Sequence, residues 1–210
     1  MRSCRLCVLG LFLGVLPGSA TALLTQYLFG SDPVPASSIA LHLTAGDLTL
    51  VGAPVATANA LFYNANSSDW PQGSLGSVYY EVTLDIDPGY ILDFTAVTLD
   101  YVVGSNPTFT TALKSSVDGY VGALSSHVDA PGISNYSDSL ADLGTQSGSI
   151  TFRIYGEVDS ASGTAGLYGG SLSFLGPGPT LAATPEPSTF ALFAGGGLLL
   201  GLARKRKKTA

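Results

Sequence analysis

The chain has 210 residues, a formal net charge of −6, and 26 glycines beside only 11% charged residues. This length gives room for one domain of ordinary size, and the composition argues against a helical bundle and favours a β-rich protein with many turns. Between residues 23 and 184 the sequence has fourteen acidic and two basic residues, a net charge of −12 that argues against nucleic acid as a partner.

The first 22 residues have the three parts of a secretory signal peptide. Arg2 and Arg5 form a basic start, residues 6–16 are apolar, and small residues at Ala20 and Ala22 offer cleavage after either one. Because the apolar run is too short for a stable membrane anchor, we expect cleavage, with a buried N-terminal helix as the alternative. Both cysteines fall inside this segment, so we expect no disulfide in the mature protein.

Residues 23–175 have the pattern of many short strands, which predicts an all-β ectodomain. Apolar and polar residues alternate over 80–86, and the turn residues 87–89 predict a hairpin with the strand character of 90–103. Further strands are predicted at residues 109–113, 120–124, 149–155 and 167–175, whereas residues 129–148 are predicted to form a loop. Roughly eight to ten strands at this spacing predict an antiparallel β-sandwich of the jelly-roll type.

The C-terminal part begins with a Pro- and Gly-rich linker at residues 176–184. Next come Pro185, Glu186 and Pro187, and then the sixteen uncharged residues 188–203. A helix of that length covers ~24 Å of a ~30 Å hydrocarbon core, and snorkelling cations can bridge the difference. The cations that follow predict a cytoplasmic end for one short transmembrane helix: Arg204, Lys205, Arg206, Lys207 and Lys208.

Residues 185–210, in this order of parts, resemble the PEP-CTERM sorting signal. The resemblance implies export by a Gram-negative-type bacterium, recognition of Pro185, Glu186 and Pro187 by an integral-membrane exosortase, and transient residence in the inner membrane. Removal of the tag would then deliver the protein to the cell surface or to an extracellular matrix of exopolysaccharide and biofilm. An ordinary permanent anchor is the alternative, because a basic stop after a short helix is common to both.

The ectodomain sequence contains no familiar catalytic motif, so we expect a protein that is not an enzyme and that needs no cofactor. His42 and His127 lie 85 positions apart and indicate no metal or triad. Asp85, Asp87 and Asp118 are the carboxylates that could converge on Ca²⁺, but one Asp-x-Asp pattern offers too few ligands to assign a metal site.

Aromatic residues raise the alternative of a carbohydrate-binding module, because rings stack on the apolar faces of sugars. Trp70 and Tyr120 are the predicted glycan contacts, chosen from a wider set that also contains Tyr63, Tyr101, Tyr136 and Tyr168. The leading hypothesis remains a structural or interaction protein of the envelope or exopolysaccharide matrix. A glycosidase is a third hypothesis, which would need two carboxylates about 5 to 10 Å apart in a cleft.

Several segments of residues 79–176 resemble the galactose-binding-like jelly rolls that are common among proteins with a PEP-CTERM sorting signal. They are Tyr90-Ile91-Leu92-Asp93 after Pro88-Gly89, Ser115-Ser116-Val117-Asp118-Gly119-Tyr120, Thr151-Phe152-Arg153-Ile154-Tyr155-Gly156, and the final Gly170-Ser171-Leu172-Ser173-Phe174 strand. The resemblance implies a jelly-roll fold for the ectodomain. Tyr168-Gly169-Gly170 stands where the family's commoner form has a polar Asp-Asn pair, so no ligand site is inferred there.

Overall fold

The computed structural model describes residues 21–29, 33–52, 57–59, 62–66, 76, 78–103, 108–159, 164–165 and 169–182. The chain divides into two compact units, Met1–Pro179 and Thr180–Ala210. The described part of the second unit holds one short strand, β17 (Thr180–Leu181). Regular structure in the described part of the first unit is β-strand apart from two short 3-10 turns, η2 (Ser116–Asp118) and η3 (Ala141–Leu143).

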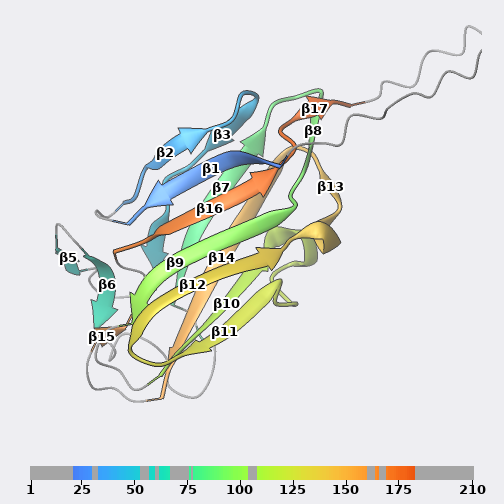
Figure 1. Ribbon diagram of the computed structural model, residues 1–210. Helices are drawn as coiled ribbons and strands as arrows, with labels where there is room; N and C mark the ends of the chain where they lie inside the picture. The colour runs from blue at the N-terminus through green and yellow to red at the C-terminus, as the bar shows by residue number, and fades with distance from the viewer. Residues whose placement is uncertain are drawn as a thin grey trace, which may run out of the picture. The chain divides into compact units, whose positions relative to one another are not determined.

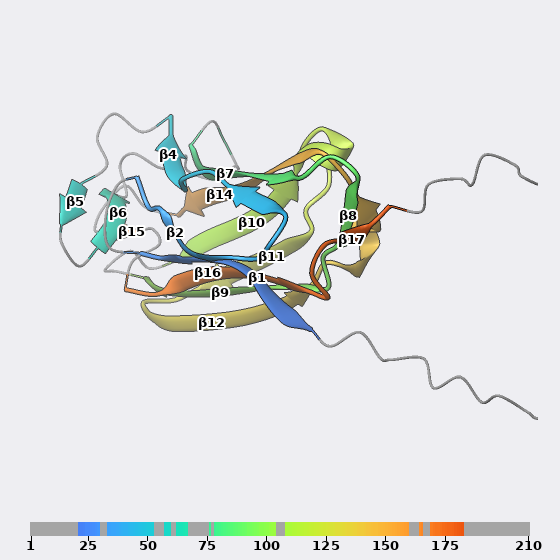
Figure 2. The ribbon, with the colours of Figure 1, turned by 90° about the horizontal axis from the view of Figure 1, so that it is seen from above.

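Two antiparallel sheets form the first unit, and Figure 2 shows them as two stacked layers. One sheet has the strand order β12 (Gly132–Ser139), β9 (Ala96–Val103), β16 (Ser171–Gly176), β1 (Ala22–Leu28) and β2 (Ala36–Ile39). The other has the order β11 (Ser125–Asp129), β10 (Phe109–Ser115), β14 (Ser149–Val158), β7 (Tyr79–Ile86) and β3 (Leu43–Ala45), with β4 (Thr49–Val51) also pairing with β7. The predicted antiparallel β-sandwich is therefore confirmed.

Short strands complete the first unit outside these two sheets. β8 (Tyr90–Asp93) pairs with β13 (Thr145–Gln146), and β6 (Phe62–Asn66) pairs with both β5 (Thr57–Asn59) and β15 (Thr164–Ala165). Figure 1 shows β5, β6 and β15 gathered at one end of the sandwich.

Strict alternation along the strands places the core between the two sheets. In β7 the even-numbered residues Tyr80, Val82, Leu84 and Ile86 are buried, as predicted, and the residues between them face outward. Three phenylalanines tie the sheets together, because Phe152 of β14 lies 5.4 Å from Phe94 and 4.5 Å from Phe174 of β16 between ring centroids. Edge-to-face and tilted ring pairs of this kind add to the stability that burial alone supplies.

The last strand of the sandwich is a central one. β16 pairs with β1 on one side and with β9 on the other, so it joins the N-terminal strands to the rest of the five-stranded sheet. The register sets Ala22 opposite Gly176, which places the beginning of β1 beside the end of β16. The predicted cleavage residue Ala22 therefore begins a sheet strand and is itself exposed.

The predicted hairpin around residues 87–89 is wrong, although the turn itself is present with Gly89 at a φ of 86°. β7 pairs with β14, β3 and β4, while β9 pairs with β12 and β16 in the opposite sheet. After the turn the chain runs through β8 and crosses from one layer of the sandwich to the other. Alternation identifies a strand and its buried face, but it does not specify the neighbour.

Two further predictions are wrong in the region after β10. Residues 120–124 form a loop instead of a strand, because Gly119 and Tyr120 both adopt left-handed backbone conformations with φ of 71° and 65°. The segment 129–148, predicted to be a loop, contains β12, η3 and β13. The inward residues of β12 include Ser134, Tyr136 and Asp138, so this strand lacks the apolar alternation by which strands are recognised.

Candidate functional site

The outer face of the six-stranded sheet carries an unusual group of side chains. Alternation points Tyr79 and Glu81 of β7, Arg153 and Tyr155 of β14, and Lys114 of β10 away from the core. The register places Tyr155 opposite Tyr79, and Arg153 opposite both Glu81 and Lys114. Together with Tyr120 these residues form what we call the tyrosine–cation face: Tyr79, Glu81, Lys114, Tyr120, Arg153 and Tyr155.

Arg153 lies at the centre of this face. Its guanidinium carbon is 4.4 Å from the ring centroid of Tyr79 and 3.8 Å from that of Tyr120. Its Nε donates to Glu81 over 2.7 Å, and the Arg153 and Glu81 side chains remain 25% and 30% exposed. Cation–π contacts at such partly exposed sites contribute about 0.5–1 kcal/mol each, so the guanidinium plane is held in one orientation while staying within reach of solvent.

The ring of Tyr155 links the second cation to the first. Lys114 Nζ lies 5.4 Å from the Tyr155 centroid, and the Tyr155 ring is tilted against that of Tyr79 at 5.1 Å between centroids. Lys114 Nζ also donates to the backbone carbonyl of Val121 over 3.4 Å. The face is therefore continuous from β10 across β14 to β7, and the loop after η2 is attached to it through Lys114 and Arg153.

Tyr120 reaches the face from a loop with a strained backbone. A φ of 65° is disfavoured for a bulky side chain, and such outliers persist where surrounding contacts enforce them. Here the Tyr120 amide donates to the Ser115 carbonyl over 2.9 Å, and the Asp118 carboxylate accepts from the Gly122 amide over 2.7 Å. These bonds hold the loop so that the Tyr120 ring covers Arg153, a placement that the amino-acid pattern alone did not reveal.

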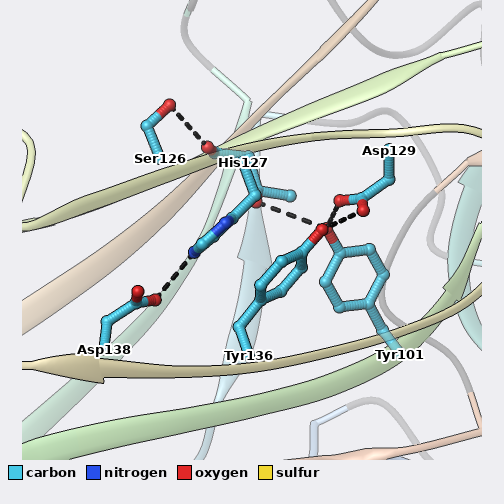
Figure 3. Close-up of polar contacts among 7 residues, drawn as sticks. Tyr101, Ser126, His127, Asp129, Tyr136 and Asp138 are labelled. Carbon is cyan, nitrogen blue, oxygen red and sulfur yellow. Dashed lines mark hydrogen bonds and ion pairs between the residues drawn. The ribbon is translucent and has the colours of Figure 1, made fainter.

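A second polar cluster lies where β11 passes into β12, at the edge of the sandwich (Figure 3). Asp129 is only 8% exposed, and it accepts hydrogen bonds from the hydroxyls of Tyr101, Tyr136 and Ser134. Tyr101 and Ser134 belong to the five-stranded sheet, whereas Asp129 ends a strand of the six-stranded sheet. A buried carboxylate with three hydroxyl donors therefore ties the two layers together.

His127 flanks this cluster on the solvent side. Its ring stacks on Tyr136 at 3.5 Å between centroids, and its Nε2 lies 2.7 Å from a carboxylate oxygen of Asp138. His42 has a similar environment, stacked on Tyr90 at 3.8 Å and 3.2 Å from Asp87. Each histidine thus stacks on a tyrosine ring of its own and lies beside an aspartate, and both arrangements can be explained by packing.

The Asp129 cluster changes the titration of its tyrosines. Burial raises the pKa of Tyr136 from 10.0 to about 12, and the hydrogen bond and negative charge of Asp129 act in the same direction. The same causes, with burial the largest, raise the pKa of Tyr101 further. The folded protein therefore holds these protons more tightly than the unfolded chain does.

The raised tyrosine pKa values predict a loss of stability in alkali. The stabilising contribution of Tyr136 is complete below pH 10.0, its ordinary pKa, and is lost as the pH rises towards its folded value of about 12. Urea unfolding at several pH values, followed by tyrosinate absorbance, should show this decline. Tyr136→Phe should reduce the slope of stability against pH, and an unchanged slope would contradict the assignment.

The three carboxylates that the sequence suggested for Ca²⁺ each have different neighbours. Asp85 is exposed on β7 opposite Ser149, Asp87 interacts with His42, and Asp118 caps the Gly122 amide. Within the described ranges, no group of three or more His, Cys, Asp or Glu side chains is arranged to hold a metal ion.

The structure describes one of the two predicted glycan contacts, Tyr120, but not the other, Trp70. Tyr120 is on the tyrosine–cation face, whereas Trp70 and Tyr168 lie outside the described residues, as do the sorting motif and basic tail. Of the wider aromatic set, Tyr101 is buried in the core and Tyr136 belongs to the Asp129 cluster.

Sequence reasoning missed Tyr79, Tyr155 and both cations as members of one site. The available signal was the alternation in residues 149–155, which puts Arg153 and Tyr155 on the polar face of one strand. That Lys114 and Tyr79 lie in the neighbouring strands depends on the strand order, which alternation does not supply.

Comparison with known protein families identifies the C-terminal region. Residues 183–207 match the PEP-CTERM protein-sorting motif. The chain carries a PEP-CTERM sorting motif. A PEP-CTERM motif marks an exported protein that is sorted to the cell surface through an exosortase. No helix among the described residues is long and apolar enough to span a membrane, and the predicted helix at 188–203 lies outside them.

No curated protein sequence matches this chain. Among solved structures, it is similar to a family two carbohydrate esterase from Cellvibrio japonicus, with 11% identity and a TM-score of 0.35 over 79% of this chain. The chain spans only 37% of the esterase's length. It is also similar to TmCBM61 in complex with β-1,4-galactotriose, with 13% identity and a TM-score of 0.24 over 67% of this chain and 88% of that one.

Proposed function

We propose that this protein is an exported, non-catalytic component of the cell surface or exopolysaccharide matrix that binds an extracellular polysaccharide. The observation that carries the proposal is the tyrosine–cation face, where three tyrosine rings and two cations lie together on one partly exposed sheet surface. Aromatic rings contact the apolar faces of sugars, and fixed polar groups beside them bind hydroxyls and orient the chain. The PEP-CTERM motif supports an extracellular setting for this face.

The face suits binding because its groups are already held in place. Arg153 is fixed by Glu81 and by two rings, and Tyr120 is fixed by the hydrogen-bonded loop that follows η2. A preorganised surface loses less conformational entropy when a ligand binds, so a modest contact area can still give measurable affinity.

Loss of Tyr155 should weaken polysaccharide binding without unfolding the protein. We expect Tyr155→Ala to reduce affinity roughly tenfold, since tyrosines at the centre of binding surfaces contribute at least about 1–2 kcal/mol. The measurement is a glycan array followed by calorimetry on the best ligand, with protein secreted through its own signal peptide. Tyr90→Ala is the matched control, because Tyr90 stacks on His42 outside the tyrosine–cation face.

A purely structural role is the second candidate function. It is favoured by the fact that one face of each of the Tyr79 and Tyr120 rings already contacts Arg153. This role would be supported, and polysaccharide binding refuted, if the protein bound no glycan on the array while its circular dichroism was that of a folded β-protein. Appearance of new reducing ends in a bound polysaccharide would refute the non-catalytic part of the proposal.

A further inference from the structure

The two basic residues of the predicted ectodomain are direct neighbours in the fold. Between residues 23 and 184 the sequence has fourteen acidic residues, and its basic residues are Lys114 and Arg153 alone. They lie opposite one another in the register of β10 and β14, 39 positions apart in the chain. Two cations scattered at random over so long an acidic domain would rarely become cross-strand partners.

This pairing is unfavourable for the sheet by itself. Like charges directly opposite one another on adjacent strands destabilise a sheet. The energy is a fraction of the roughly 0.2–1 kcal/mol that a cross-strand side-chain pair contributes. Glu81 compensates one of the two charges through its 2.7 Å bond to Arg153. Lys114, Arg153 and Glu81 together therefore carry one net positive charge, in a domain whose net charge is otherwise strongly negative.

Asp118 is the acid nearest to the cations on the loop side, because its carboxylate accepts from the Gly122 amide and the carbonyl of the same peptide, that of Val121, accepts from Lys114. The acids along the strands lie farther away. Asp85 and Glu157 lie four residues from Glu81 and Arg153 along their strands, which corresponds to about 13 Å at 3.3 Å per residue. That separation exceeds the screening length of about 8–10 Å at ordinary ionic strength. The tyrosine–cation face is thus where the positive charge of residues 23–184 is concentrated, and Asp118 at its loop edge and Glu81 beside Arg153 offset part of that charge.

We propose that the tyrosine–cation face binds an acidic polysaccharide, with Lys114 and Arg153 contacting the sugar's anionic group and the flanking tyrosines contacting its ring. This inference rests on the proposed function and names its ligand class. A guanidinium whose plane is fixed by stacking can make directed, charge-assisted hydrogen bonds to a carboxylate or sulfate. The three rings favour a sugar over an acidic peptide, because a peptide carboxylate offers no flat apolar ring for them to contact.

The test compares two forms of one polymer, polygalacturonate and its methyl ester, which differ in charge but share a backbone. We expect the secreted wild-type protein to bind polygalacturonate at least about tenfold more tightly than the ester. Lys114→Gln and Arg153→Gln should each weaken binding to polygalacturonate roughly tenfold to a hundredfold, as expected for loss of a charge-assisted contact, and should affect the ester little.

Two controls keep the result specific. Ser137→Asp changes the net charge as much as Lys114→Gln does, but on an exposed position of β12 in the other sheet, so it should leave binding unchanged. Arg153→Lys keeps the charge and loses the planar stacking, so it should lie between wild type and Arg153→Gln. Thermal unfolding of each variant identifies any that fail to fold. Lys114→Gln leaves the ion pair between Arg153 and Glu81 intact.

The outcomes separate the two levels of the proposal. Equal binding of polygalacturonate and its ester would overturn the acidic ligand while leaving polysaccharide binding intact, whereas failure to bind any glycan would overturn both. Binding of poly-glutamate as tight as that of polygalacturonate, and insensitive to Tyr155→Ala, would overturn the sugar in favour of an acidic protein partner. Dextran sulfate distinguishes the anion: tighter binding than polygalacturonate assigns a sulfated ligand, and weaker binding a carboxylated one.

Discussion

Replacing Asp129 with alanine is expected to lower the free energy of unfolding by about 3 to 5 kcal/mol. The substitution leaves the hydroxyls of Tyr101, Tyr136 and Ser134 without their shared acceptor at a largely buried position. Each buried polar group that loses its partner costs about 1–3 kcal/mol. Urea unfolding at neutral pH, followed by circular dichroism, measures the change.

Two other substitutions show whether the carboxylate is responsible. Asp129→Asn keeps the shape and one acceptor oxygen, so its loss should be smaller than that of Asp129→Ala. Asp138→Ala removes the carboxylate beside His127. The Asp138 and His127 side chains are 26% and 20% exposed, so this loss should cost no more than about 1 kcal/mol. Equal losses for Asp129→Ala and Asp138→Ala would show that Asp129 does not tie the sheets together.

Gly170→Ala should destabilise the sandwich by about 3 kcal/mol or more. A Cβ atom at this position would lie 1.9 Å from the carbonyl oxygen and 2.5 Å from the carbonyl carbon of Asp100. These are backbone atoms of β9, so the clash cannot be relieved by a side-chain rotation and β9 and the start of β16 must separate. Differential scanning calorimetry should show a lower midpoint for the variant than for the wild-type protein.

Gly46→Ala is the matched control for this prediction. Its added Cβ would meet the Thr83 carbonyl oxygen at 3.4 Å, an ordinary contact, and its φ lies outside the left-handed region. We expect a change within about 0.5 kcal/mol, as for most surface substitutions. A Gly170→Ala variant as stable as Gly46→Ala would contradict a close approach of the β9 backbone to Gly170.

The fold class followed from the sequence because local patterns encode it. The alternation in residues 80–86 and 149–155 specifies both the strands and their buried faces, and Phe109 begins the strand predicted there. These signals require only neighbouring residues, and the abundance of glycine and turn residues adds the expectation of short strands. The PEP-CTERM motif was equally accessible, because its parts are contiguous in the sequence.

The site could not be predicted in the same way because it depends on pairings distant in the chain. Arg153 meets Glu81 across 72 positions, and Tyr120 reaches Arg153 only because its backbone adopts a left-handed conformation. β12 was missed because its inward side chains are polar and are satisfied by Asp129 from another strand. Local propensity is overridden in both cases by contacts that form only in the assembled sandwich.

The central position of β16 determines when the five-stranded sheet can be completed. Among the described residues, β1 and β2 are hydrogen-bonded to the β9–β12 pair only through β16, so the five-stranded sheet cannot be completed before residues 171–176 arrive. Pairings of such long sequence separation form late and slowly. Until residues 171–176 have been synthesised, the five-stranded sheet therefore stays in two separate parts, β1–β2 and β9–β12.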